Sequence, residues 1–127
     1  MAENITILAD NIMEGTTPKI TATIQDEDGS AIDTADITTL TLNLYNLDDT
    51  DNTIINSRSD QDVHNTNNVT VSSAGALVWS VQALDTIMVG SDLVERHRAV
   101  FKWTYSSGTK TGSYVIDMAI RNLEKVT

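Results

Sequence analysis

The sequence predicts an all-β protein, an antiparallel β-sandwich of about seven to eight strands with at most one short helical turn. Three observations predict this fold class. Apolar residues alternate with polar residues at a period of two through most of the chain. Turn-forming residues separate the alternating segments at short, regular intervals. Threonine, whose branched Cβ suits a pleated surface, occupies many of the polar positions.

The length of 127 residues predicts a single domain, 1–127, that is large enough for a core of its own. The clearest strand places Leu40, Leu42 and Leu44 on one side, and Trp79 and Trp103 fall on the core sides of two later strands. The segments expected to be strands are ITIL at 5–8, KITATIQ at 19–25, ITTLTLNLYNL at 37–47, TIIN at 53–56, VTVS at 69–72, ALVWSVQ at 76–82, RAVFKWTY at 98–105 and SYVIDMAIRNL at 113–123.

The connections between these strands differ in character. SSGT at 106–109 is typical of a tight hairpin. The stretch 48–68 is rich in Asp and Asn, so we expect a long exposed loop, interrupted at most by a short edge strand at 53–57. The one helical candidate is VQALDTIMVGSDLVER at 81–96, which Gly90 limits to about two turns.

Composition excludes several classes of protein. The chain has no cysteine, which excludes a disulfide scaffold, a thiol nucleophile and a cysteine zinc site. Its formal charge is −10, and the basic residues are scattered apart from a small patch at Arg96, Arg98 and Lys102. Binding to nucleic acid or to anionic lipid needs clustered cations, so neither is expected as a partner. No signal peptide and no apolar run of membrane-spanning length is present, so we expect synthesis in the cytoplasm.

Acidic residues raise the question of a calcium site. A helix-loop-helix calcium loop needs D-x-[DN]-x-[DN]-G with a glutamate at the twelfth position. The chain starting at Asp26 has its glycine two places early, and the chain starting at Asp49 has Ile54 in place of the glycine. We therefore interpret DEDG at 26–29 as a turn. A calcium site of another kind, at Asp26 and Asp28 or at Asp49 and Asp51, is the alternative.

No motif predicts an enzyme. The sequence has no G-x-S-x-G, no P-loop and no G-x-G-x-x-G. His64 and His97 lie far apart without metal-ligand spacing, and the carboxylates at 48–62 lie among Asn, Thr and Ser. We expect no catalytic residue, no metal and no cofactor. An exposed patch of Tyr45, Tyr105 and Tyr114 is the alternative to packing for those side chains.

The order of short motifs resembles the immunoglobulin-like domains of tailed-bacteriophage structural proteins, such as the N-terminal domain of baseplate upper proteins. In this sequence the shared features are the lead-in GTTP, the strand ITATI, the turn DEDG, the alternating strand LTLNL, the strand GALVW, the pair Ser107–Gly108 in a hairpin and the closing strand YVIDMAI. Together they extend over about 15–122. The resemblance implies an immunoglobulin-like sandwich.

The resemblance also implies a function. The chain would be a non-enzymatic virion protein, an accessory or decoration component of the head, neck or tail that acts through protein–protein contacts. Its partners would be capsid, neck or tail proteins, with a homo-oligomer in the assembled particle. It would be made in the bacterial cytoplasm and reside in the virion.

Two further points stay open at this stage. Residues 1–15, with Ile5, Ile7 and Leu8, are either a docking arm or the first strand of the chain's own sandwich. The alternative functions are a carbohydrate- or cell-surface-binding immunoglobulin-like module acting through loops such as 48–68, and a calcium-stabilised adhesion domain.

Overall fold

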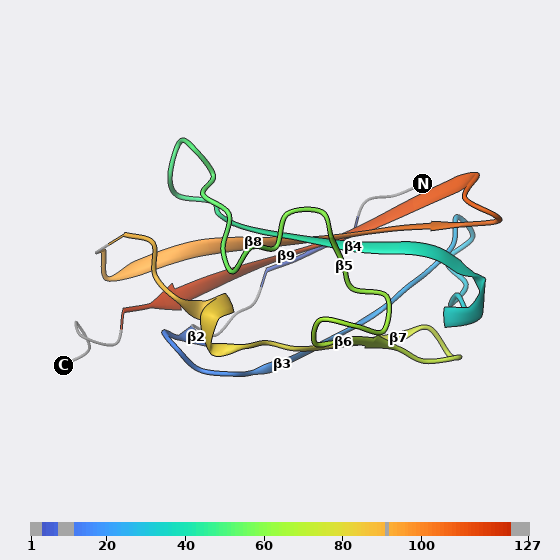
Figure 1. The fold of residues 1–127 in the computed structure, drawn as a ribbon, viewed down its shortest axis with the longest axis horizontal. Coiled ribbons are helices and arrows are strands. Elements are labelled where there is room, and N and C mark those ends of the chain that lie inside the picture. The colour runs from blue at the N-terminus through green and yellow to red at the C-terminus, as the bar shows by residue number, and fades with distance from the viewer. Residues whose placement is uncertain (1–3, 8–11, 91, 123–127) are drawn as a thin grey trace.

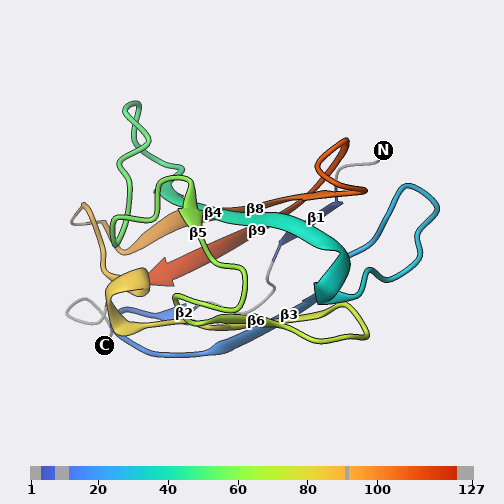
Figure 2. The same ribbon diagram turned by 45° about the vertical axis from the view of Figure 1, so that its right-hand side comes forward.

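The computed structural model describes residues 4–7, 12–90 and 92–122, which form two β-sheets packed face to face. The larger sheet has six strands, in the order β1-β9-β8-β4-β5, and β2 also pairs with β9. The smaller sheet has three, in the order β3-β7-β6. Figure 1 shows the two layers, and Figure 2 shows them in a view turned by 45°. The strands are β1 (Asn4–Ile7), β2 (Ile12–Met13), β3 (Lys19–Thr23), β4 (Ile37–Asn46), β5 (Gln61–Asp62), β6 (Val69–Val71), β7 (Ala76–Ser80), β8 (Val94–Tyr105) and β9 (Lys110–Arg121).

The strand order is that of an immunoglobulin-like sandwich. Strands β6, β7 and β3 occupy the places of strands D, E and B, and β5, β4, β8 and β9 occupy those of C′, C, F and G. All pairs among these seven strands are antiparallel, whereas β1 and β2 add parallel to β9. The predicted all-β sandwich is confirmed.

Helical structure is limited to two single 3-10 turns in the described part of the chain, η1 (Thr34–Asp36) and η2 (Ala83–Thr86), one turn more than expected. The second turn is all that forms of the helical candidate at 81–96. The reason is that the period-two pattern of β8 already begins at Val94, with Glu95 and His97 buried on the same side as the apolar residues that follow.

The core lies between the sheets, where the sequence pattern places it. Leu40, Leu42 and Leu44 are fully buried along β4, as predicted. Trp79 on β7 meets Phe101 on β8 edge to face, with ring centroids 5.7 Å apart, so that aromatic packing joins the two sheets. Trp103 is also buried, and the predicted central positions of both tryptophans are confirmed.

The first strand belongs to the chain's own larger sheet. Asn4–Ile7 pairs in parallel with β9, with Asn4 opposite Tyr114. Within the described residues the segment is therefore a sandwich strand, the alternative interpretation, and not a projecting arm. Leu8 lies outside the described residues, and the docking role of Ile5 and Ile7 stays a prediction for the outer edge of this sheet.

The connection 48–68 is long and mostly exposed, as its composition predicts, but three of its side chains are not. Ile55, Arg58 and Val63 are buried. The expected edge strand at 53–57 is a single bridge between Ile54 and Tyr45, and the strand that forms is β5. The prediction of exposure is wrong for these side chains because two isolated apolar residues reach the core and the buried arginine has an ionic partner.

Candidate interaction surface

The DEDG segment is a turn, as predicted. Asp26 Oδ1 accepts hydrogen bonds from the backbone amides of Asp28 and Ser30, at 2.9 and 3.0 Å. Gly29 has a φ of +81°, a conformation that glycine adopts without steric cost. The carboxylate of Asp26 thus satisfies two backbone amides within the turn and fixes the connection from β3 to β4.

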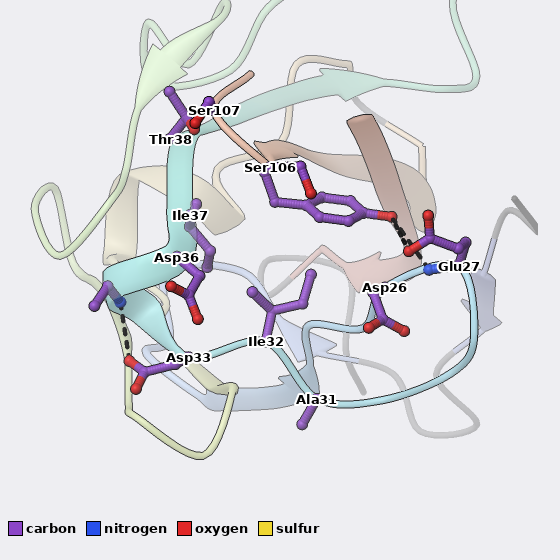
Figure 3. Close-up of a pocket in the computed structure, with 12 residues that line it drawn as sticks. Asp26, Glu27, Ala31, Ile32, Asp33, Asp36, Ile37, Thr38, Ser106 and Ser107 are labelled. Atoms are coloured by element: carbon purple, nitrogen blue, oxygen red, sulfur yellow. Dashed lines mark hydrogen bonds between the residues drawn. The ribbon is translucent and has the colours of Figure 1, made fainter. Parts of the chain in front are cut away.

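A hollow of about 500 Å³ opens beside this turn, between the 25–37 connection and the β8–β9 hairpin (Figure 3). Four carboxylates line it: Asp26, Glu27, Asp33 and Asp36. Most of them already have structural roles. Asp33 Oδ1 accepts from the amide of Ala35 at the start of η1, at 2.9 Å. The acids of this hollow are therefore principally turn and cap residues.

Glu27 is the carboxylate of this hollow with the most partners outside its own loop. It forms an ion pair with Lys110, which holds the pKa of Glu27 below its ordinary value and raises the pKa of Lys110. The Tyr105 hydroxyl accepts from the Glu27 amide at 3.1 Å, and burial of the phenol raises the pKa of Tyr105. These contacts fasten the acidic turn to the β8–β9 hairpin.

The calcium candidates form two separate pairs. Asp26 and Asp28 lie with Glu27 in the 25–31 connection, where carboxylate oxygens of the three residues lie within 4.8 Å of one another. Asp49 and Asp51 lie in the connection at the opposite end of the sandwich (Figure 1). Asp49 accepts from the amide and hydroxyl of Thr53, at 3.0 and 2.7 Å, and the hydroxyl bond lowers the pKa of Asp49. This aspartate, like Asp26, forms a turn.

The two histidines are also far apart in the fold. His64 bonds through Nε2 to Thr34, whereas His97 is fully buried on β8 with its Nε2 atom 2.6 Å from Glu95 Oε2. The Glu95 carboxylate also accepts from the backbone amides of Val89 and Gly90, at 2.8 and 2.7 Å. Glu95 therefore fixes the connection between η2 and β8.

A second buried carboxylate, that of Asp85, fixes the connection between β4 and β5. Arg58 and Asp85 are 2% and 0% exposed, and two hydrogen bonds join them: Nε to Oδ1 at 2.6 Å and Nη2 to Oδ2 at 3.1 Å. The guanidinium also lies 5.9 Å from the centroid of the Trp79 ring. Neither residue stands out in the sequence, because they lie 27 residues apart and become neighbours only in the fold.

The predicted basic patch on β8 is largely neutralised. Arg96 pairs with Asp48 at 2.9 Å. Arg98 makes two bonds to Asp117, at 2.7 and 2.9 Å, which raise the pKa of Arg98. The structure therefore offers no row of free cations on this strand for a phosphate backbone.

The aromatic side chains form no exposed platform in the part of the chain that the structure describes. Trp79, Phe101, Trp103 and Tyr105 are buried. The alternative of an exposed tyrosine patch is wrong for Tyr105, since its ring fills space beside the acidic turn. Stacking of a sugar ring needs an accessible aromatic face, so this arrangement does not favour the carbohydrate-binding alternative.

Exposed large apolar side chains gather instead on two connections, 47–60 and 81–93, at one end of the sandwich (Figure 1). The exposed fractions are 42% for Ile54, 57% for Leu84, 42% for Ile87, 46% for Val89 and 44% for Leu93. The first four, together with Ile55 and Asn56, line a groove of about 210 Å³. We refer to this feature, lined by residues 54–56, 84, 87 and 89, as the apolar groove. Sequence reasoning missed it, because its apolar residues come from two connections that are far apart in the sequence and meet only in the fold.

No protein-family model, no curated protein and no solved structure matches the chain. Among the residues that the structure describes, no helix is long and apolar enough to cross a membrane.

Proposed function

We propose that the chain is a non-enzymatic structural protein of a tailed-bacteriophage particle, an accessory or decoration component of the head, neck or tail. It acts through contacts with other proteins. The observation that carries the proposal is the apolar groove, since exposed apolar side chains gathered in one place typically mark a contact surface. The phage context comes from the order of the sequence motifs between residues 15 and 122.

The groove has the chemistry of a contact surface and not that of an active site. Ile54, Ile55, Leu84, Ile87 and Val89 supply all of its lining except for one amide. That amide, Asn56 Nδ2, already donates to Asp85 at 2.8 Å. A general acid, base or nucleophile would have to be a titratable or hydroxyl group, and none lines the groove.

The sheet edges suit assembly as well. Strands β1 and β5 end the larger sheet, and β3 and β6 end the smaller one, in the described part of the chain. An open edge presents backbone groups that can pair with a strand of a neighbouring protein. These edges support the proposed homo-oligomer in the assembled particle and the proposed contacts with capsid, neck or tail proteins.

The proposal is tested on particles. Virions of the phage that encodes the chain are purified by density gradient, and their proteins are identified by peptide mass spectrometry. We expect the chain in stoichiometric amounts, and gold-labelled antibodies against it should decorate the head, neck or tail in electron micrographs. The chain is made in the host cytoplasm and resides in the virion under this proposal. Its absence from purified particles, with the capsid protein detected in the same sample, would refute the proposal.

A further inference from the structure

We propose that the apolar groove binds a segment of a different protein in which apolar side chains are flanked by lysine or arginine. The inference rests on the proposed function, because it specifies the chemistry of the partner that the virion protein contacts. Three properties of the groove lead to it: its size, the charge of the two connections that form it and the way their backbones are fixed.

The size of the groove fits side chains and not a whole small molecule. Its volume is about 210 Å³. Pockets that enclose small-molecule ligands typically measure about 300–1,000 Å³. Leu84 and Ile87 line the groove from the connection 81–93, and Ile54 lines it from the connection 47–60. Apolar side chains projecting from a partner segment would be covered on both sides, which is how anchor residues are held in protein interfaces.

The charge of the two connections specifies the flanking residues of the partner. Residues 47–60 and 81–93 carry six aspartates and one arginine. The arginine, Arg58, is buried together with Asp85, so this pair adds nothing to the surface charge. Five aspartates remain, and one of them, Asp48, pairs with Arg96. Asp51 and Asp92 lie three residues from Ile54 and Val89 along the chain, and both are exposed. Cationic side chains beside the apolar anchors would meet these carboxylates.

The same charge argues against two other occupants. A second copy of the chain would bring its own acidic connections against those of the first, and each copy has a formal charge of −10. Like charges placed opposite each other across an interface cost free energy and slow association. An anionic membrane surface is excluded on the same ground, because adsorption to it depends on lysine and arginine.

Both sides of the groove are fixed before a partner arrives. Asn56 donates to the buried Asp85 at 2.8 Å, and the Val89 amide donates to Glu95 at 2.8 Å. The connection 47–60 is thereby tied through a side chain, and the connection 81–93 through its backbone, to a carboxylate in the interior of the sandwich. A surface that is already ordered loses little conformational entropy on binding, which favours recognition of a short segment.

The test uses the full chain, labelled with ¹⁵N, and two synthetic peptides. One peptide combines leucine and isoleucine with lysine, and the other has glutamate at every lysine position. Titration is followed by amide chemical shifts. We expect the lysine peptide to shift resonances of residues 54–56 and 84–89, more strongly at low than at high salt. The glutamate peptide should bind at least about tenfold more weakly.

Variants locate the binding site. The double substitution Leu84→Asn with Ile87→Asn replaces two exposed apolar side chains of the groove. It should lower the affinity for the lysine peptide by about tenfold or more. Leu93→Asn is the matched control, because Leu93 is 44% exposed on the same connection but does not line the groove. It should change the affinity by less than about twofold. Circular dichroism should show the fold unchanged in both variants.

Several results would overturn the inference. They are failure of the lysine peptide to bind, equal binding of the glutamate peptide, and wild-type affinity in the Leu84→Asn, Ile87→Asn variant. A dimer in sedimentation equilibrium that this variant abolishes would assign the groove to a second copy and overturn it too.

The inference and the proposed function can fail separately. Incorporation of the Leu84→Asn, Ile87→Asn variant into virions at the wild-type level would refute the groove as the binding site and leave the virion role unaffected. Specific peptide binding by a chain that is absent from virions would overturn the virion role alone.

Discussion

Removing the charge of Asp85 should destabilise the protein severely. The substitution Asp85→Asn keeps the shape of the side chain and replaces one carboxylate oxygen by an amide that donates instead of accepting. In the structure this carboxylate is fully buried and faces only donors. The variant would leave the guanidinium of Arg58 in the interior without its counter-charge.

The magnitude follows from the contacts. The two oxygens of Asp85 accept from Arg58 Nε at 2.6 Å, Arg58 Nη2 at 3.1 Å, Asn56 Nδ2 at 2.8 Å and the Gln82 amide at 2.8 Å. Removing one partner of a buried ion pair costs about 3–5 kcal/mol, because the other charge remains buried. Since natural domains have free energies of unfolding of about 5–15 kcal/mol, the expected loss is a large fraction of the total. For a domain of this size it corresponds to a fall in Tm of roughly 10–20 °C.

Urea denaturation followed by tryptophan fluorescence measures this loss. Trp79 is a direct reporter, because the Arg58 guanidinium lies 5.9 Å from its ring centroid. The control is Arg96→Gln, which breaks an exposed ion pair with Asp48 and should cost less than about 1 kcal/mol. A double-mutant cycle with Arg58→Met should show that the two losses are not additive, since either substitution alone breaks the same pair.

One result would refute the reasoning. If Asp85→Asn lowered the free energy of unfolding by no more than the Arg96→Gln control does, the buried pair could not be what holds the connection 47–60 against η2. Asp85→Asn could also cost the expected free energy of unfolding while its loss and that of Arg58→Met add up fully in the double mutant. That result would assign the effect to the bonds of Asp85 with Asn56 and Gln82 instead.

Two further predictions concern the β8–β9 hairpin. Gly112→Ala should lower the free energy of unfolding, measured by urea titration, by about 1–3 kcal/mol, because the added Cβ would lie 2.5 Å from the buried ring of Trp103. The control Thr111→Ala changes an exposed neighbour and should cost less than about 0.5 kcal/mol in the same measurement. Lys110→Met should raise the pKa of Glu27 towards its ordinary value, as measured by NMR titration of its side chain. Because folding lowers this pKa, the ion pair stabilises the protein above the ordinary glutamate pKa, and the stability difference between wild type and Lys110→Met should vanish as the pH falls through the lowered value. An unchanged Glu27 pKa would contradict the second prediction.

The sandwich could be predicted from the sequence because its signal is local. The alternation of Leu40, Leu42 and Leu44 identifies one buried strand face without any knowledge of its partner. The hairpin at 106–109 is also local, since Ser106, Ser107 and Gly108 all take positive φ values in it. A period and a turn can both be found within a short window of residues.

The candidate surface could not be predicted in this way because its contacts are not local. Arg58 and Asp85 are 27 residues apart, and the sequence places the first in an expected exposed loop and the second in a helical candidate. Glu95 and His97 did carry a signal, since they occupy the inward positions of the β8 alternation, but the predicted strand begins only at Arg98, and Glu95 falls in the helical candidate. A charged residue at an inward position of a strand is thus a reason to look for a buried partner.

The two buried carboxylates also explain why apolar side chains remain at the surface. The interior between the sheets is filled by residues such as Leu42, Trp79 and Phe101, so Ile87 and Val89 have no room to move inward. Asp85 accepts from the Asn56 side chain and the Gln82 amide, and Glu95 accepts from the amides of Val89 and Gly90, so both connections are held in place beside the groove. The exposure of Leu84 and its neighbours is therefore a consequence of anchoring, and burial under a partner would recover the hydrophobic free energy that the isolated chain forgoes.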